Sequence, residues 1–128
     1  MHTDDIQIPG YRIERLLGRG GMAGVYLATQ ESLDRLVALK ILHTDNAPAG
    51  FAERFISEGK IIAGLNHPYI ITIHDIGVIG NLYYISMEYI AGGDLKQLIQ
   101  QGITLEQSLD IMRKIGHCLQ FVHQKGIV

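Results

Sequence analysis

Cysteine, proline and tryptophan are scarce in this sequence, which has one cysteine, three prolines and no tryptophan among 128 residues. The single cysteine, Cys118, excludes an internal disulfide and fits a reducing compartment. Because no activating neighbour of its thiol is identifiable, we interpret Cys118 as part of a helix core and not as a nucleophile. The six histidines lack the spacing of metal ligands, so we expect no metal site among them.

Neither an excess of one charge nor a long apolar run is present. The formal net charge is −2 and the eleven lysines and arginines are scattered, which argues against a nucleic-acid partner. Residues 1–5 are polar and acidic and lack the basic region and the apolar core of a signal peptide, and no apolar run reaches about 18 residues. We therefore expect a cytoplasmic segment without membrane contact. A hydrophobic content of 47% predicts that the chain folds.

Glycine, by contrast, is frequent, with 15 residues, and it concentrates in one turn. This turn consists of Gly18, Arg19, Gly20, Gly21, Met22, Ala23 and Gly24. Because glycine has no Cβ, main-chain N–H groups in such a turn can approach a phosphate closely. The turn therefore predicts a cover over a polyphosphate.

Three kinds of glycine loop bind phosphates, and the residues after the turn distinguish them. A Walker loop ends in Gly-Lys followed by Ser or Thr, whereas Val25 follows the last glycine here. A dinucleotide-binding turn leads directly into a helix, with an acidic residue about 20 positions later. Residues 25–29 instead favour a second strand, and the later position is occupied by Lys40. We therefore set aside a dinucleotide oxidoreductase, which a helix over residues 24–30 would restore.

The predicted strand over residues 36–42 contains Lys40 as its only charged residue. Since side chains alternate along a strand, Ala38 and Lys40 lie on the same face. The small residue leaves room for a base, while the lysine can reach phosphates. This placement favours a binding site over a solvated surface lysine.

A helix is predicted over residues 51–65, with Glu58 in its apolar stripe. The stripe consists of Phe51, Phe55, Ile62 and Leu65. A buried carboxylate without a partner costs several kcal/mol, so Lys40 is the natural partner of Glu58. Gly59 and Gly64 each weaken the helix by about 1 kcal/mol relative to alanine, which favours mobility of this helix.

These features occur in an order that resembles the protein kinase family, and most closely the eukaryotic-like serine/threonine kinases of bacteria. The ordered set is Gly18, Gly20, Val25, Ala38, Lys40, Glu58, His67-Pro68 and Met87-Glu88-Tyr89. Ala23 replaces the third glycine of the family pattern, a mild departure because alanine is also small. The resemblance covers residues 11–128. It implies an α+β fold, in which an N-lobe with a five-stranded antiparallel sheet and one main helix precedes two helices of a truncated C-lobe.

The resemblance also implies ATP and Mg²⁺ as cofactors, although the family's Mg²⁺ ligands are not among these residues. Residues 18–24 would cover the phosphates, and Lys40 would hold them with Glu58 as its anchor. The base and ribose would be bound by Leu17, Val25, Ala38 and Met87, the backbone carbonyl of Glu88, the backbone N–H of Ile90, and Asp94. A helix N-cap explains Asp94 equally well.

The predicted organisation has three parts. Residues 1–10 are a lead-in, residues 11–91 the nucleotide-binding N-lobe, and residues 92–128 the end of the hinge and the start of the C-lobe. Further strands are expected over residues 11–17, 69–77 and 82–89, and helices over 95–101 and 105–124. Capping-box residues Thr104 and Gln107 mark the start of the last helix.

We therefore predict the ATP-binding part of a kinase that transfers the γ-phosphate of ATP to serine or threonine of protein substrates. Similar kinases continue beyond Gly-Ile-Val with His-Arg-Asp, so we expect these 128 residues to be inactive alone. The alternative is a freestanding, non-catalytic kinase-like interaction module. Lys40 and Glu58 argue against this alternative, whereas the ending at Val128 argues for it. The apolar stripe of the last helix predicts self-association.

Overall fold

The computed structural model describes residues 6–20, 23–45 and 47–127, which form two compact units. Unit 1 contains the residues up to Gly64 together with Ile71–Tyr89. Unit 2 contains Leu65–Ile70 together with the residues from Ile90 onward. The predicted boundary between the nucleotide-binding N-lobe and the start of the C-lobe, between residues 91 and 92, stays a prediction.

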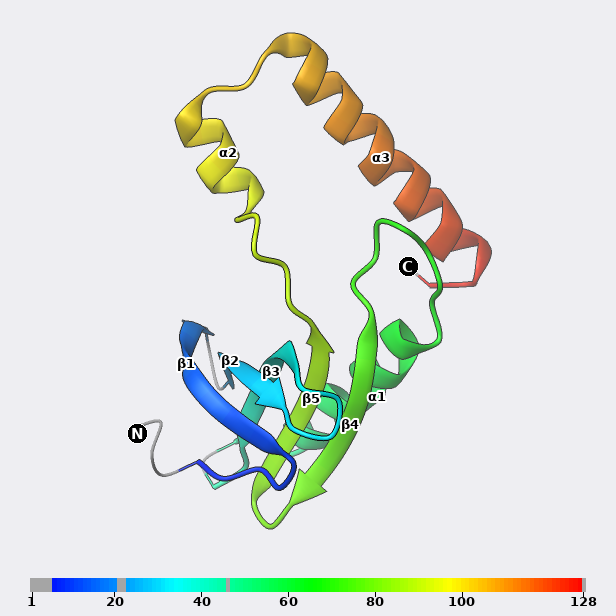
Figure 1. The fold of residues 1–128 in the computed structure, drawn as a ribbon. Helices are drawn as coiled ribbons and strands as arrows, with labels where there is room; N and C mark the ends of the chain where they lie inside the picture. The colour runs from blue at the N-terminus through cyan, green and yellow to red at the C-terminus, as the bar shows by residue number, and fades with distance from the viewer. Residues whose placement is uncertain (1–5, 21–22, 46, 128) are drawn as a thin grey trace. The chain divides into compact units, whose positions relative to one another are not determined.

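Unit 1 is built on an antiparallel sheet, and unit 2 contains two helices (Figure 1). The elements are β1 (Tyr11–Gly20), β2 (Ala23–Gln30), β3 (Arg35–His43), α1 (Phe51–Ala63), β4 (Ile73–Ile79), β5 (Leu82–Glu88), α2 (Leu95–Gln101) and α3 (Leu105–Gln124). The five strands follow the order β1-β2-β3-β5-β4, and all neighbours are antiparallel. The predicted α+β class with a five-stranded antiparallel sheet is confirmed.

The glycine turn connects β1 to β2 as a hairpin. Gly20 pairs with Ala23 at its end, so a strand and not a helix follows the turn. This strand excludes the dinucleotide-binding geometry. The predicted phosphate-covering residues Gly21 and Met22 lie outside the described residues. Two register shifts flank Arg15 and Leu16, so the regular alternation of side chains between the two faces is interrupted in this part of β1.

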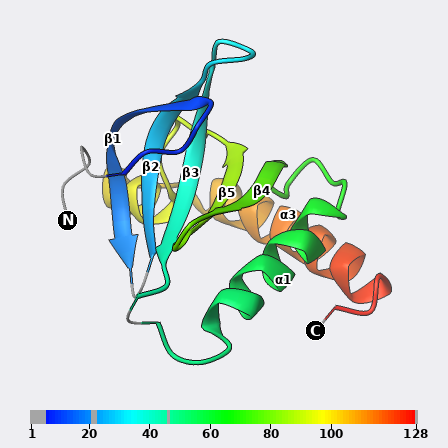
Figure 2. The same cartoon turned by 90° about the horizontal axis from the view of Figure 1, so that it is seen from below.

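The two faces of the sheet have different partners. On one face, Leu39 and Tyr26 belong to a buried cluster that includes Ile6 and Ile8 of the N-terminal segment. On the other face, Phe55 of α1 packs against a cluster with Leu42 and Ile85. Figure 2 shows α1 alongside this face of the sheet. The second face is the one that carries Lys40, because Lys40 and Leu42 are two positions apart in β3.

The strand β4 begins later than predicted, at Ile73 instead of residue 69. The intervening residues form a turn in which the N–H of Ile70 donates to the carbonyl of His67 at 3.1 Å. The imidazole Nδ1 of His67 also accepts a hydrogen bond from the N–H of Tyr69 at 3.1 Å. Backbone groups that are bonded within this turn are not available to a strand partner.

Two glycines allow close packing in unit 1. A Cβ on Gly59 would lie 2.8 Å from Ile85 Cδ1, so the absence of a side chain lets α1 approach β5. The interpretation of Gly59 as a cause of mobility is therefore incomplete, because its packing offsets its low helix propensity. At Gly77, a Cβ would lie 2.6 Å from Cε1 of Tyr84, whose ring is buried.

We expect Gly77→Ala to lower the free energy of unfolding by about 1–3 kcal/mol, because the added methyl forces the Tyr84 ring out of its site. Urea denaturation of the 128-residue chain measures this change. Gly18→Ala is the matched control, since a Cβ there meets nothing within 4 Å. Its expected effect is within about 0.5 kcal/mol. Equal stability of the two variants would contradict the close contact.

Both helices of unit 2 begin with a capping box. Asp94 accepts a hydrogen bond from the N–H of Gln97 at 2.8 Å, and Thr104 accepts from that of Gln107 at 3.0 Å. The predicted caps are confirmed, and the reciprocal bond from Gln97 to the Asp94 N–H adds a second box. The predicted stripe of α3 is exposed at Leu105, Leu109, Met112, Ile115 and Leu119. Self-association through it stays a prediction. No helix in the described ranges is long and apolar enough to cross a membrane.

Candidate functional site

Lys40 occupies the middle of the sheet, on β3. It pairs with Val25 of β2 on one side and with Ile85 of β5 on the other. Residues that face each other in antiparallel strands point to the same side of the sheet. The side chains of Val25, Lys40 and Ile85 therefore form one row on the face that carries α1.

Ala38 lies in the next row of the same face. Its partners are Leu27 of β2 and Met87 of β5, so the predicted base-binding residues Val25, Ala38 and Met87 share one face with Lys40. Ala38 is only 6% exposed. Leu27 completes this row but was not singled out from the sequence, because an apolar strand residue has no distinguishing signal before the register is known.

The other predicted base and ribose residues are distributed over both units. Leu17 lies at a register shift of β1 and is 37% exposed. Glu88 donates its N–H to the carbonyl of Thr72 at 2.8 Å, and its carboxylate accepts the N–H of Thr72 at 3.1 Å. Ile90 and Asp94 belong to unit 2. Asp94 serves there as the cap of α2, and its contact with a ribose stays a prediction.

A cavity of about 270 Å³ lies beside Lys40 in unit 1. Its lining residues are Gly20, Ala23, Lys40, Phe51, Arg54, Phe55 and Glu58. The cavity thus brings together the end of the glycine hairpin, the strand lysine and the helix glutamate, which are far apart in sequence. These residues were predicted to act on one set of phosphates.

Lys40 is half-buried, and its ammonium lies 5.6 Å from the centre of the Phe55 ring. This cation–π contact holds the charge at the cavity without neutralising it. Among the described residues, no salt bridge joins Lys40 to Glu58. The lysine therefore keeps N–H donors for an anionic ligand, and the ion pair with Glu58 stays a prediction.

Glu58 is exposed, so its predicted place inside the apolar stripe of α1 is wrong. The buried residues of α1 are Phe55 and Gly59, and successive helix residues are about 100° apart. Glu58 lies on the flank of that stripe, at the rim of the cavity. Its carboxylate is hydrated there, and burial does not force it to pair with Lys40.

Arg54 is a second cation at the cavity that the sequence analysis did not identify. It precedes Glu58 by four residues, so the two side chains lie on the same side of α1. The spacing is visible in the sequence, but it points to Arg54 only once Glu58 is known to line the cavity. With two cations and one carboxylate, the cavity has a net positive charge that favours a phosphate ligand.

The glycines of the hairpin have different structural roles. A Cβ on Gly18 or Gly20 would meet nothing within 4 Å, and neither residue has a positive φ. The fold itself therefore does not require glycine at these two positions, and the space beside their backbone is open to a ligand. A Cβ on Gly24 would instead lie 3.0 Å from the Tyr26 ring, so packing explains that glycine.

Comparisons with known proteins give matches along nearly the whole chain. The model of the protein kinase domain matches residues 11–128. Serine/threonine-protein kinase PrkC of Bacillus subtilis is 43% identical over 121 residues, which cover 92% of this chain and 19% of PrkC. PknJ of Mycobacterium tuberculosis is 35% identical over 121 residues, covering 93% of this chain and 20% of PknJ.

A third relative, serine/threonine-protein kinase pkn2 of Myxococcus xanthus, is 37% identical over 128 residues, which are 98% of this chain and 15% of pkn2. The chain thus spans about a fifth or less of the length of these three relatives. All three relatives are named serine/threonine-protein kinases. Since the family model matches nearly all of the sequence, this chain belongs to the protein kinase domain family.

Proposed function

We propose that this chain is the ATP-binding part of a serine/threonine protein kinase, which transfers the γ-phosphate of ATP to serine or threonine of protein substrates. The observation that carries this proposal is the cavity at which Lys40 and Arg54 face the end of the glycine hairpin. The names of the relatives support the choice of serine and threonine. We also propose a cytoplasmic location, because ATP is supplied there.

The residues fit a polyphosphate. Main-chain N–H groups of the hairpin at Gly18 and Gly20 can approach phosphate oxygens, since no side chain occupies the space beside them. Lys40 and Arg54 supply positive charge, and Glu58 at the rim anchors the lysine once a ligand draws it away from Phe55. ATP supplies the phosphoryl group when bound, and the protein's task is to position it and neutralise its charge.

The base would lie on the sheet face in front of Lys40. Val25, Ala38 and Met87 give this face a flat apolar surface in which the small Ala38 leaves space. Leu17 would cover the base from β1, and the backbone groups of Glu88 and Ile90 would bind its edge. Asp94 would reach the ribose while it caps α2.

Protein kinases in general use Mg²⁺ together with ATP. Within the described ranges, no group of three or more histidine, cysteine, aspartate or glutamate residues could hold a metal ion. The described residues therefore do not fit a magnesium site of their own.

We expect the 128-residue chain to bind Mg²⁺–ATP with a dissociation constant in the range of about 1 μM–1 mM that is typical of enzyme substrates. Calorimetric titration measures the affinity, and amide NMR shifts should locate it on the hairpin and β3. Arg54→Gln should weaken binding about fivefold, because it removes one cation from the cavity.

Lys60→Gln is the matched control, because it removes an exposed cation from the same helix that does not line this cavity. Its affinity for ATP should change less than twofold. Equal losses in both variants, or shifts that avoid the hairpin and β3, would contradict the proposed site.

A further inference from the structure

A second cavity lies in unit 2, and none of its lining residues is assigned to ATP. It has a volume of about 300 Å³, and its lining residues are His67, Pro68, Tyr69, Arg113, Lys114 and His117. One wall is the turn before β4, and the other is a single side of α3, where residues 113, 114 and 117 are neighbours. Four of the six lining side chains are basic and none is acidic.

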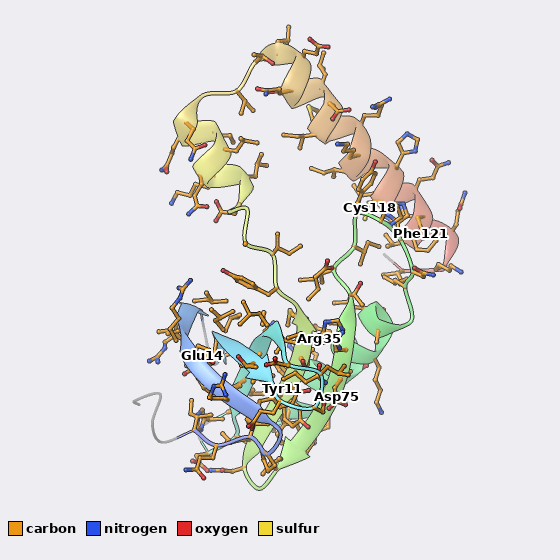
Figure 3. All side chains as sticks on the ribbon, viewed as in Figure 1. Tyr11, Glu14, Arg35, Asp75, Cys118 and Phe121 are labelled. Atoms are coloured by element: carbon orange, nitrogen blue, oxygen red, sulfur yellow. The ribbon has the colours of Figure 1, made fainter. Side chains whose placement is uncertain are left out.

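Aromatic contacts hold the two walls together. The His67 ring lies 4.9 Å from the ring of Phe121, which Figure 3 labels on α3. The Lys114 ammonium lies 5.7 Å from the centre of the Tyr69 ring. Since Nδ1 of His67 accepts the N–H of Tyr69, the proton of a neutral His67 is on Nε2, which remains a donor. The turn and the helix thus form a preorganised cavity.

The cations at this cavity are only partly compensated. Asp110 is the carboxylate that pairs with both Arg113, at 2.6 Å, and Lys114, at 3.1 Å. The hydrogen bond from Arg113, followed by that from Lys114, holds the pKa of Asp110 below its usual value. One carboxylate shared by two cations leaves one net positive charge. Residues 65–70 and 111–128 contain no aspartate or glutamate that could cancel it.

The shared carboxylate also orients the two cations while leaving most of their donors free. A guanidinium has five N–H donors and an ammonium three, and His67 and His117 add ring N–H groups. A phosphate dianion matches such a set, because its oxygens accept several charge-assisted hydrogen bonds at once. A volume of about 300 Å³ is sufficient for a phosphate group and the short carbon stem that carries it.

We propose that the cavity between the His67 turn and α3 binds a phosphate monoester dianion, such as a phosphorylated serine or threonine side chain. Arg113 and Lys114 neutralise the phosphate, the two histidines donate to its oxygens, and Pro68 and Tyr69 contact the carbon stem of the ligand. This cavity shares no lining residue with the ATP cavity, so the two proposals can be tested independently.

Amide NMR titration of the 128-residue chain tests the site, with N-acetyl-O-phosphoserine amide and inorganic phosphate as separate probes and without ATP. We expect saturable shifts at His67, Tyr69 and residues 113–117 with the phosphoserine probe, and none with N-acetylserine amide. Tighter binding of phosphoserine assigns the site to a modified side chain, whereas tighter binding of inorganic phosphate assigns it to the free ion. Both orders uphold a phosphate site.

Arg113→Gln should weaken binding of the phosphoserine probe about tenfold, and Lys114→Gln provides an independent variant if the first disturbs α3. Lys96→Gln is the charge-matched control, because it removes an exposed cation from α2 that does not line the cavity. Its affinity should change less than twofold. Shifts that do not saturate, or an equal loss in Lys96→Gln, would overturn the proposal.

Discussion

Lys40→Met is expected to lower phosphotransferase activity by about 10²–10³-fold, the cost of removing one preorganised charge from a transition state. The suitable protein is a chimera in which residues 11–128 replace the matching segment of the B. subtilis PrkC kinase, which is 43% identical. Methionine keeps the length and the apolar stem of the side chain but removes the ammonium that lies beside Phe55. Incorporation of labelled phosphate into a protein substrate measures the loss.

Lys60→Met in the same chimera is the matched control, since this lysine is exposed on α1 and does not line the cavity at Lys40. Its activity should stay within about twofold of the parent chimera. Full activity of the Lys40 variant would contradict the proposal that the cavity at Lys40 binds the phosphates of ATP. Comparable losses in both variants would mean that general charge, and not the cavity, decides the activity.

Leu39→Ala should lower the free energy of unfolding by about 2–5 kcal/mol, which is a large fraction of the stability of a small domain. Leu39 has no exposed surface and lies at the centre of the sheet, between Tyr26 of β2 and Ser86 of β5. Truncation removes apolar contacts and leaves a cavity that the surrounding strands cannot easily fill. Urea denaturation, followed by circular dichroism, measures the change.

Leu33→Ala is the same substitution at a site that is 60% exposed, in the connection between β2 and β3. Its expected effect is within about 0.5 kcal/mol, because little apolar surface is buried there. A similar loss in both variants would show that Leu33 is packed in solution. A small effect of Leu39→Ala would contradict the central position of this side chain.

The strands and helices could largely be predicted from the sequence, because local signals and packing agree there. The hairpin at the glycine turn follows from Val25 and its neighbours, which favour a strand, and the last helix follows from the capping pair at Thr104. The start of β4 could not be predicted, since residues 69–72 are compatible with a strand. Hydrogen bonds around His67 decide against it.

The candidate site was predictable in its residue types but not in its contacts. Periodicity correctly placed Ala38 and Lys40 on one face, since the strand period is fixed by backbone geometry. The exposure of Glu58 was not predictable, because a residue on the flank of a helical stripe is buried or hydrated depending on how the helix is rotated against the sheet. The same rotation determines that Arg54 lines the cavity.

Glycine shows the limit of sequence reasoning most clearly. Gly18, Gly59 and Gly77 are the same residue in three situations: open space, a close helix contact and an aromatic ring. Helix propensity predicts only that Gly59 lowers the stability of α1. The close approach of Gly59 to Ile85 depends on β5, a strand more than 20 residues away in the sequence. Such long-range packing depends on the folded arrangement of the strands and cannot be inferred from the residue type.

The chain crosses between its two units three times, after Gly64, Ile70 and Tyr89. A gene rearrangement that exchanged only the part after Tyr89 would therefore import a new α3 and keep the old His67 turn. Residues that now touch Phe121 would meet a foreign surface, even though the splice lies in a short linker. The His67 turn and α3 therefore have to be exchanged together to keep this contact. They are inherited as one unit, although the strands β4 and β5 lie between them in the sequence.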